Sequence, residues 1–216
     1  MNMSENTTCP LCHHTQITPY HRDKKRSYLQ CHTCDLVFVP DMHHLNTTDE
    51  KAYYDLHDNQ PHDPAYLRFL DRLYSPLNER LQLNATGLDV GCGPGPALAT
   101  MFEEAGHTVA LYDPYYAPDK SVLSQNYDFI TLSEVVEHMA CPGRELDNLW
   151  AQLVPGGWIG IMTKRVRDAE AFKTWHYITD PTHISYFSET TFQWLSAHWS
   201  AKLTIIGTDV VLIQKV

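Results

Sequence analysis

Two acidic residues and a short run of glycines are spaced as a site for a nucleotide-like ligand requires. Asp89 stands just before the turn GCGPG at residues 91–95, and a second acid, Asp113, lies further along the chain. Glycine adopts positive φ angles and lets a ligand approach the backbone closely. In an α/β sheet, such a turn lies at the carboxyl edge of a strand, where these ligands bind. A carboxylate at the end of the next strand can bind ribose hydroxyls.

Four of the six cysteines form two C-x-x-C pairs, Cys9 with Cys12 and Cys31 with Cys34. The spacing between the pairs is typical of structural zinc sites, and four thiolates make a closed tetrahedral site. We therefore predict one zinc ion bound by all four cysteines in a module that resembles a zinc ribbon. A disulfide framework is the alternative, which the lack of a recognisable export signal disfavours.

Hydrophobic patterning predicts the elements that position these residues. The predicted strands lie near residues 87–91, 108–113, 127–132 and 157–163. The predicted helices lie near residues 96–105, 142–153 and 188–199. This alternation is typical of a doubly wound α/β sheet. The two apolar runs at 201–206 and 210–214 flank a turn and predict a terminal hairpin.

A further amphipathic helix is predicted upstream of the sheet. Asp63 is a good N-cap and Pro64 a good first helical residue. Leucines recur after them at helical spacing, which predicts a face that packs on the sheet. Residues 49–57 predict a second, shorter helix.

The glycine spacing separates two classes of ligand. Dinucleotide-binding turns carry G-x-G-x-x-G, whereas Pro96 occupies the position of the third glycine here. This residue and the terminal hairpin argue against a nicotinamide-dependent enzyme. The spacing is instead D-x-G-x-G-x-G, which resembles the first motif of the class I S-adenosylmethionine-dependent methyltransferases. The second strand of that family ends in an acid like Asp113.

The resemblance extends over roughly residues 85–216. The sequence E-V-x-E-H at 134–138 resembles the tail of the family's fourth strand, and P-G-G at 155–157 resembles its turn into the fifth. It implies a Rossmann-like α/β sheet of the seven-strand type that ends in an antiparallel hairpin. The segment between Asp113 and Asp128 is too short for the usual third strand and its helices, so we expect that edge of the sheet to be abridged.

We therefore expect three parts: a zinc ribbon at 1–40, a connector with helices at 41–84, and a methyltransferase domain at 85–216. The resemblance implies a set of residues around S-adenosylmethionine at the ends of the first, second and fourth strands. These residues are Asp89, Gly91, Cys92, Gly93, Asp113, Leu132, Ser133 and Glu134.

Two histidines are candidates for positioning the methyl acceptor or removing its proton. Histidine titrates near neutral pH and serves as a base without a large change in its pKa. His183 is preferred because its loop follows the predicted fifth strand, where this family places a substrate-covering segment. His138 ends the E-V-x-E-H sequence, and holding the donor-side helix in place is its alternative role.

Composition favours a small-molecule acceptor. The net charge of −10 argues against a broad nucleic-acid surface. The sequence contains no apolar run long enough for a membrane span, so we expect a cytoplasmic protein. The basic cluster at residues 21–26 is expected to be a solvated loop. Nothing in the sequence specifies an oligomeric state. The alternative to an enzyme is a non-catalytic scaffold that uses the ribbon to contact protein or RNA.

Overall fold

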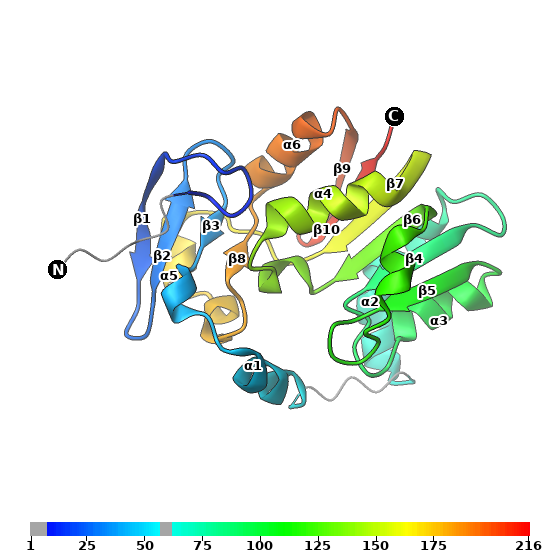
Figure 1. Ribbon diagram of the computed structural model, residues 1–216, viewed down its shortest axis with the longest axis horizontal. Coiled ribbons are helices and arrows are strands. Elements are labelled where there is room, and N and C mark those ends of the chain that lie inside the picture. Colours follow the sequence, from blue (N-terminus) through cyan, green and yellow to red (C-terminus); the bar gives the residue numbers. More distant parts are fainter. Residues whose placement is uncertain (1–7, 57–61) are drawn as a thin grey trace.

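A large mixed sheet forms the centre of the molecule (Figure 1). The computed structural model describes residues 8–56 and 62–216, and among them the sheet has the order β5-β4-β6-β7-β10-β9. Its strands are β4 (Thr86–Val90), β5 (Thr108–Tyr112), β6 (Tyr127–Ser133), β7 (Leu153–Met162), β9 (Lys202–Ile206) and β10 (Val210–Gln214). β4, β5, β6 and β7 are parallel, whereas β10 is antiparallel to both β7 and β9. The predicted α/β fold and its terminal hairpin are therefore confirmed.

Helices cover both faces of this sheet. One face carries α2 (Pro64–Asn78), which packs on β7 and β10, and α3 (Ala97–Glu104), which packs on β5 and against α2. The other carries α4 (Pro142–Gln152) and α6 (Glu189–His198). Asp63 caps α2 as expected, through a hydrogen bond from the backbone N–H of Ala65 (2.8 Å). The shorter helix, α1 (Thr47–Tyr54), ends before His57, which lies outside the described residues.

The sheet is abridged at the expected edge. Between β5 and β6, a stretch that the structure describes throughout, the chain forms only a short 3-10 helix, η2 (Lys120–Ser124). β5 is consequently the edge strand. The space beside Asp113 is closed by a tight turn, in which the backbones of Asp113 and Ala117 pair.

The cysteine-bearing segment forms a second sheet that takes its last strand from the other end of the chain. β1 (Ile17–Arg22), β2 (Ser27–Cys31) and β3 (Val37–Phe38) are antiparallel neighbours, and β8 (Ser185–Tyr186) pairs with β3. In Figure 1 this second sheet lies beside the large one, with α5 (Ala169–Lys173) against it. The segment after β7 is therefore part of the fold of the ribbon.

Close contacts attach the two C-x-x-C turns to the helices of the large sheet. Gly143, in the first turn of α4, lies so near the first of these turns that a Cβ would stand 2.2 Å from the carbonyl oxygen of Leu11. On the second turn, Asp35 accepts a hydrogen bond from Ser188 Oγ (2.6 Å), and Ser188 is the N-cap of α6. Cys9, Cys31 and Cys34 belong to the same buried cluster as the core of the sheet.

Candidate active site

The glycine turn opens into a large cavity at the carboxyl edge of the sheet. The cavity has a volume of about 810 Å³. Val90 ends β4 at its wall, and the turn that follows keeps Gly91 and Gly93 at positive φ angles of 70° and 63°. A Cβ on Gly91 would collide with Val135, whereas a Cβ on Gly93 would meet nothing within 4 Å. Gly93 therefore faces open space, as a residue beside a ligand should.

Asp113 holds this turn together. One carboxylate oxygen accepts a hydrogen bond from the backbone N–H of Gly93 (3.1 Å). The other accepts from the N–H groups of Tyr115 and Tyr116, at 2.8 and 3.0 Å. These bonds leave acceptor capacity on the carboxylate, because its two oxygens carry about four lone pairs. Asp113 lines the cavity.

Of the eight predicted donor residues, six line the cavity: Gly91, Cys92, Gly93, Asp113, Ser133 and Glu134. The structure places Asp89 and Leu132 one layer below, among the strands, with exposures of 3% and 0%. Burial raises the pKa of Asp89 to about 7, although a hydrogen bond from Thr131 Oγ1 (2.7 Å) partly opposes this. Asp89 accordingly supports the sheet beneath the turn.

The pH dependence of stability checks this placement of Asp89. A carboxyl whose pKa is about 7 in the folded state and 3.8 as a free group loses its proton first in the unfolded chain. The free energy of unfolding therefore falls as the pH rises through this range. Asp89→Asn removes the fall. The difference in free energy of unfolding, Asp89→Asn minus wild type, should therefore rise by about 2 kcal/mol from pH 5.5 to pH 8. Denaturant titrations of both proteins at the two pH values measure this rise. A difference between variant and wild type that is the same at both pH values would contradict the placement of Asp89.

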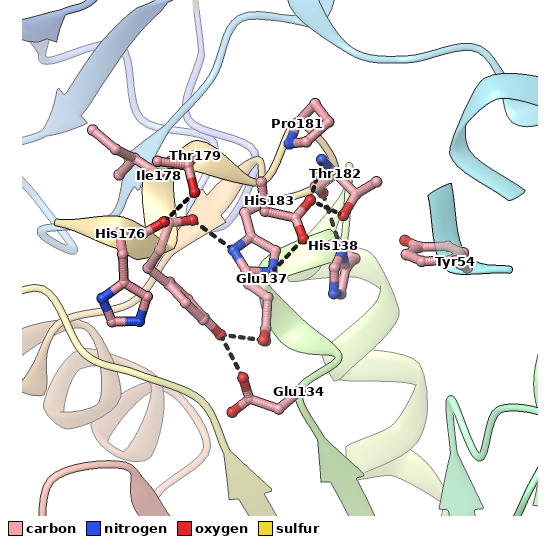
Figure 2. A network of polar contacts seen from close by, with 12 residues as sticks. Tyr54, Glu134, Glu137, His138, His176, Ile178, Thr179, Pro181, Thr182 and His183 are labelled. Carbon is pink, nitrogen blue, oxygen red and sulfur yellow. Dashed lines mark hydrogen bonds and ion pairs between the residues drawn. The ribbon is translucent and has the colours of Figure 1, made fainter. Parts of the chain in front are cut away.

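Both candidate histidines also line the cavity. His138 ends the 3-10 helix η3 (Val136–His138), and its Nδ1 bonds the carbonyl oxygen of Thr182 (3.1 Å). His183 lies in the loop after η4 (His176–Thr179), and its Nδ1 bonds the carbonyl oxygen of Tyr177 (2.8 Å). The two rings lie 4.8 Å apart, centroid to centroid, and Figure 2 shows them beside Glu137.

Two glutamates lie beside these rings, Glu137 fully buried and Glu134 half-buried (Figure 2). Tyr177 Oη donates to Glu137, and it lies 3.2 Å from Glu134 Oε2. Burial raises the pKa of Glu134 to about 7 and that of Glu137 to about 8. Glu134 has a positive φ of 53°, an uncommon conformation for a side-chain-bearing residue. Its backbone N–H donates to the carbonyl oxygen of Met162 (2.7 Å), which fixes this conformation at the end of β6.

Several residues of the cavity wall were not predicted from the sequence as site residues. Tyr115, which follows Asp113 closely, donates a hydrogen bond to Glu50 of α1 (2.5 Å). Tyr54, also from α1, donates to Glu50 (3.1 Å), and its ring meets that of His138 edge-on at 5.2 Å. α1 thereby closes the cavity from the N-terminal side, with Tyr54 opposite His138 (Figure 2). Asp180 lines the cavity beside His183.

Arg26 was expected in a solvated loop, but it is buried, with 7% of its surface exposed. The guanidinium donates to four carbonyl oxygens of the His183 loop, those of Ile178, Asp180, Pro181 and His183, at 2.7–3.0 Å. It also donates to the hydroxyl groups of Tyr28 and Tyr186. The planar fork of arginine suits this task, because its five N–H groups diverge in fixed directions. One residue of the ribbon thus organises the loop that carries Asp180 and His183.

The four cysteines of the ribbon lie in one buried cluster. Each offers a sulfur, and all four sulfurs lie within 4.8 Å of one another. The Cys9–Cys34 and Cys12–Cys31 sulfur pairs are 3.5 and 3.4 Å apart. Sulfurs bound to a tetrahedral zinc at ~2.3 Å stand ~3.8 Å apart, whereas disulfide-bonded sulfurs stand ~2 Å apart. The arrangement fits a Cys₄ metal site better than a disulfide framework.

Within the described residues, no helix is both long and apolar enough to cross a membrane. Solved structures with similar folds are numerous. The 1,6-didemethyltoxoflavin-N1-methyltransferase of Burkholderia thailandensis, solved with its substrate and S-adenosylhomocysteine, is 18% identical, with a TM-score of 0.50 over 91% of this chain and 98% of that one. An S-adenosylmethionine-dependent methyltransferase of Archaeoglobus fulgidus is 14% identical, with a TM-score of 0.52 over 68% of this chain and 93% of that one.

A coclaurine N-methyltransferase is 15% identical, with a TM-score of 0.48. That alignment covers 70% of this chain, which spans only about half (54%) of the enzyme's length. No curated protein matches the chain in sequence. A family of proteins described as "Methyltransferase domain" matches residues 60–198, which is more than half of the chain. The chain therefore belongs to this methyltransferase family, with the fold of the class I S-adenosylmethionine-dependent enzymes.

Proposed function

We propose that the protein transfers the methyl group of S-adenosylmethionine to a small-molecule acceptor bound in the same cavity. The observation that carries this proposal is that one cavity is lined by the glycine turn, Asp113, His138 and His183 together. The donor lies along the turn, with its ribose at Asp113. The acceptor lies beside Tyr54 and the two histidines, in the part of the cavity that they line.

Methyl transfer requires the protein mainly to position the donor and the acceptor. The sulfonium already activates the methyl group, and the reaction is an in-line displacement in which the acceptor attacks as the thioether leaves. Holding two reactants in line contributes most of the acceleration in such a reaction. A proton-bearing acceptor must also lose its proton, and His183 and His138 face the place where it is lost.

The shape of the cavity supports a small acceptor. α1 and the Tyr115 turn close over it, and tyrosine rings form much of its wall. A volume of about 810 Å³ suits a donor with a compact partner. The toxoflavin-precursor enzyme of similar fold holds a compact heterocycle. The chain's net charge of −10 weighs against a polyanionic acceptor.

Binding of the donor tests the first half of the proposal. Asp113→Ala removes an anionic acceptor from the ribose and from the turn, so it should weaken S-adenosylmethionine binding ~10–150-fold. Gly93→Val places a branched side chain in the open space beside the turn and should abolish binding. Isothermal titration calorimetry measures both effects.

A matched control separates steric blocking from backbone strain. Gly156 also has a positive φ, 83°, and a Cβ there would meet nothing within 4 Å, but it lies exposed on the far end of β7. Gly156→Val therefore carries the same kind of strain without entering the cavity, and it should bind the donor as the wild type does. Equal affinities for Gly93→Val and Gly156→Val would place the donor elsewhere.

The acceptor half is tested by His183→Gln. This variant should keep the fold and the donor affinity while lowering turnover ~10²-fold with a proton-bearing acceptor. The acceptor is first found by screening metabolites for methyl transfer from labelled donor. Replacing His138 should affect donor affinity at least as much as turnover. Full activity of His183→Gln would remove this residue from the reaction.

We also propose that the cysteine cluster holds one structural zinc ion. The four thiols, their spacing and their burial support this assignment. The complete Cys₄ set leaves no open coordination position, so the ion has no direct part in methyl transfer. Its contribution is to fix the ribbon, and through Arg26 the loop that carries His183.

A further inference from the structure

The acceptor half of the cavity contains a second group of potential metal ligands, separate from the cysteines. Glu137, His138 and His183 each offer one ligand atom, and these three atoms all lie within 4.8 Å of one another. Glu137 is fully buried and His183 is 8% exposed. They come from two segments, η3 and the loop after η4, that the hydrogen bond between His138 Nδ1 and Thr182 joins. Figure 2 shows the three side chains converging.

The hydrogen bonds of the two rings define which nitrogen is the ligand. A carbonyl oxygen only accepts, so His138 Nδ1 and His183 Nδ1 each carry the proton that they donate to Thr182 and Tyr177. A neutral ring with its proton on Nδ1 has its lone pair on Nε2. Metal-ligating histidines are typically held in this way, with the second nitrogen donating to a carbonyl or carboxylate.

Glu137 supplies an independent observation. One of its oxygens accepts from Tyr177 Oη, while the other, Oε2, is buried and accepts no hydrogen bond of normal geometry among the described residues, although the nearby Thr163 hydroxyl lowers the pKa of this carboxyl and so partly opposes its burial. A buried carboxylate oxygen without a partner is costly. A cation bound beside the two rings would satisfy it.

From this geometry we propose that Glu137, His138 and His183 bind a divalent first-row transition-metal cation. Two imidazoles and one carboxylate are the ligand set of many catalytic zinc and non-haem iron sites, which keep open positions for substrate or water. Both histidines line the cavity, so a cation bound by them would lie at its wall, within reach of a bound acceptor. Asp180, whose Oδ2 lies 3.7 Å from His183 Nε2, adds negative charge next to the ion.

The proposal deepens the proposed function, on which the role of the ion depends. An acceptor hydroxyl bound to the cation gives up its proton more readily. The O–H bond breaks and the proton passes to solvent. The oxygen then forms its bond to the methyl group as the sulfur–methyl bond breaks, which leaves a methyl ether and the neutral thioether S-adenosylhomocysteine. The acceptor class that fits this site therefore carries a hydroxyl group.

The test is a cobalt titration of the full-length protein whose cysteine site has first been filled with zinc. Co²⁺ bound to nitrogen and oxygen ligands has visible d–d absorption, whereas a thiolate-to-cobalt charge-transfer band would report exchange into the cysteine cluster. We expect one equivalent of Co²⁺ to bind without that band. His183→Gln and Glu137→Gln, which nearly preserve shape, should each weaken this binding at least ~100-fold, more than the usual effect of losing an outer partner of a ligand.

His176→Gln is the matched control, since His176 lies on the same segment but outside the cluster, exposed and bonded to Lys164. It should bind Co²⁺ as the wild type does. Circular dichroism and zinc content establish that each variant is folded. Cobalt that binds only with the charge-transfer band, or equally to all variants, would overturn the proposal. Donor calorimetry on the same samples distinguishes this failure from a failure of the methyltransferase assignment, because donor binding at the glycine turn does not require the cation.

Discussion

Replacing Arg26 by methionine is expected to destabilise the protein by roughly 3–5 kcal/mol. This is a large effect for a charged residue, because charged side chains are seldom buried in a protein core. Methionine fills part of the volume but donates no hydrogen bond. Four carbonyl oxygens of the 178–183 segment then lose the guanidinium as a donor, two of them at buried positions. Arg26→Lys should recover only part of the loss, because an ammonium group cannot reach divergent acceptors as the planar fork does.

Denaturant unfolding gives the change in free energy, and hydrogen exchange locates it. The amides of residues 176–186 should exchange much faster in Arg26→Met than in the wild type. Arg22→Met is the matched control, since Arg22 is an exposed arginine of the same hairpin. If Arg26→Met unfolds at the same denaturant concentration as this control, the guanidinium is not what holds the loop.

Loss of the zinc ion is the second large expected effect. Cys31→Ser removes one thiolate from the buried cluster, and elemental analysis should find about one zinc per wild-type chain and almost none in the variant. Binding of a structural zinc contributes directly to folding free energy. Hydrogen exchange should rise across β1, β2 and β3. It should rise in β8 as well, because β8 pairs with β3.

The large sheet should remain folded in Cys31→Ser, since none of its six strands comes from the cysteine-bearing segment. Cys141→Ser is the control: it changes a half-buried thiol outside the cluster and should keep the metal. Unchanged zinc content in Cys31→Ser would refute the assignment. Faster exchange confined to β1–β3 would show that the metal does not support the His183 loop.

The parts of the fold that local sequence encodes were predictable. β4, β5 and β6 are short apolar runs that end at the glycine turn, at Asp113 and at Ser133, and each lies where the pattern predicted. The abridged edge followed from the length of the chain between two strands. The C-x-x-C spacing of the four cysteines predicts a shared metal site, and the structure brings their sulfurs together.

Residues whose role depends on distant partners were not predictable in this way. Arg26 lies in a run of charged residues that is typical of a solvated loop, and its acceptors are up to 160 residues away. β8 is a strand of two residues, too short to show any alternation. α1 is weakly amphipathic, so its sequence does not indicate that Glu50 would line the cavity and bind the Tyr115 turn.

The pairing of β8 with β3, which is far away in sequence, has a consequence for the order of folding during synthesis. A nascent chain leaves the ribosome N-terminus first, and most modules that come early can fold before the rest is made. Here the first sheet needs β8 and Arg26 needs the 178–183 carbonyl groups, so the segment at residues 17–38 completes its structure only after residue 186 has emerged. Contacts so distant in sequence also slow folding. The cysteine-bearing segment therefore stays incomplete until β8 is made, and dividing the chain after residue 40 would separate strands of one sheet.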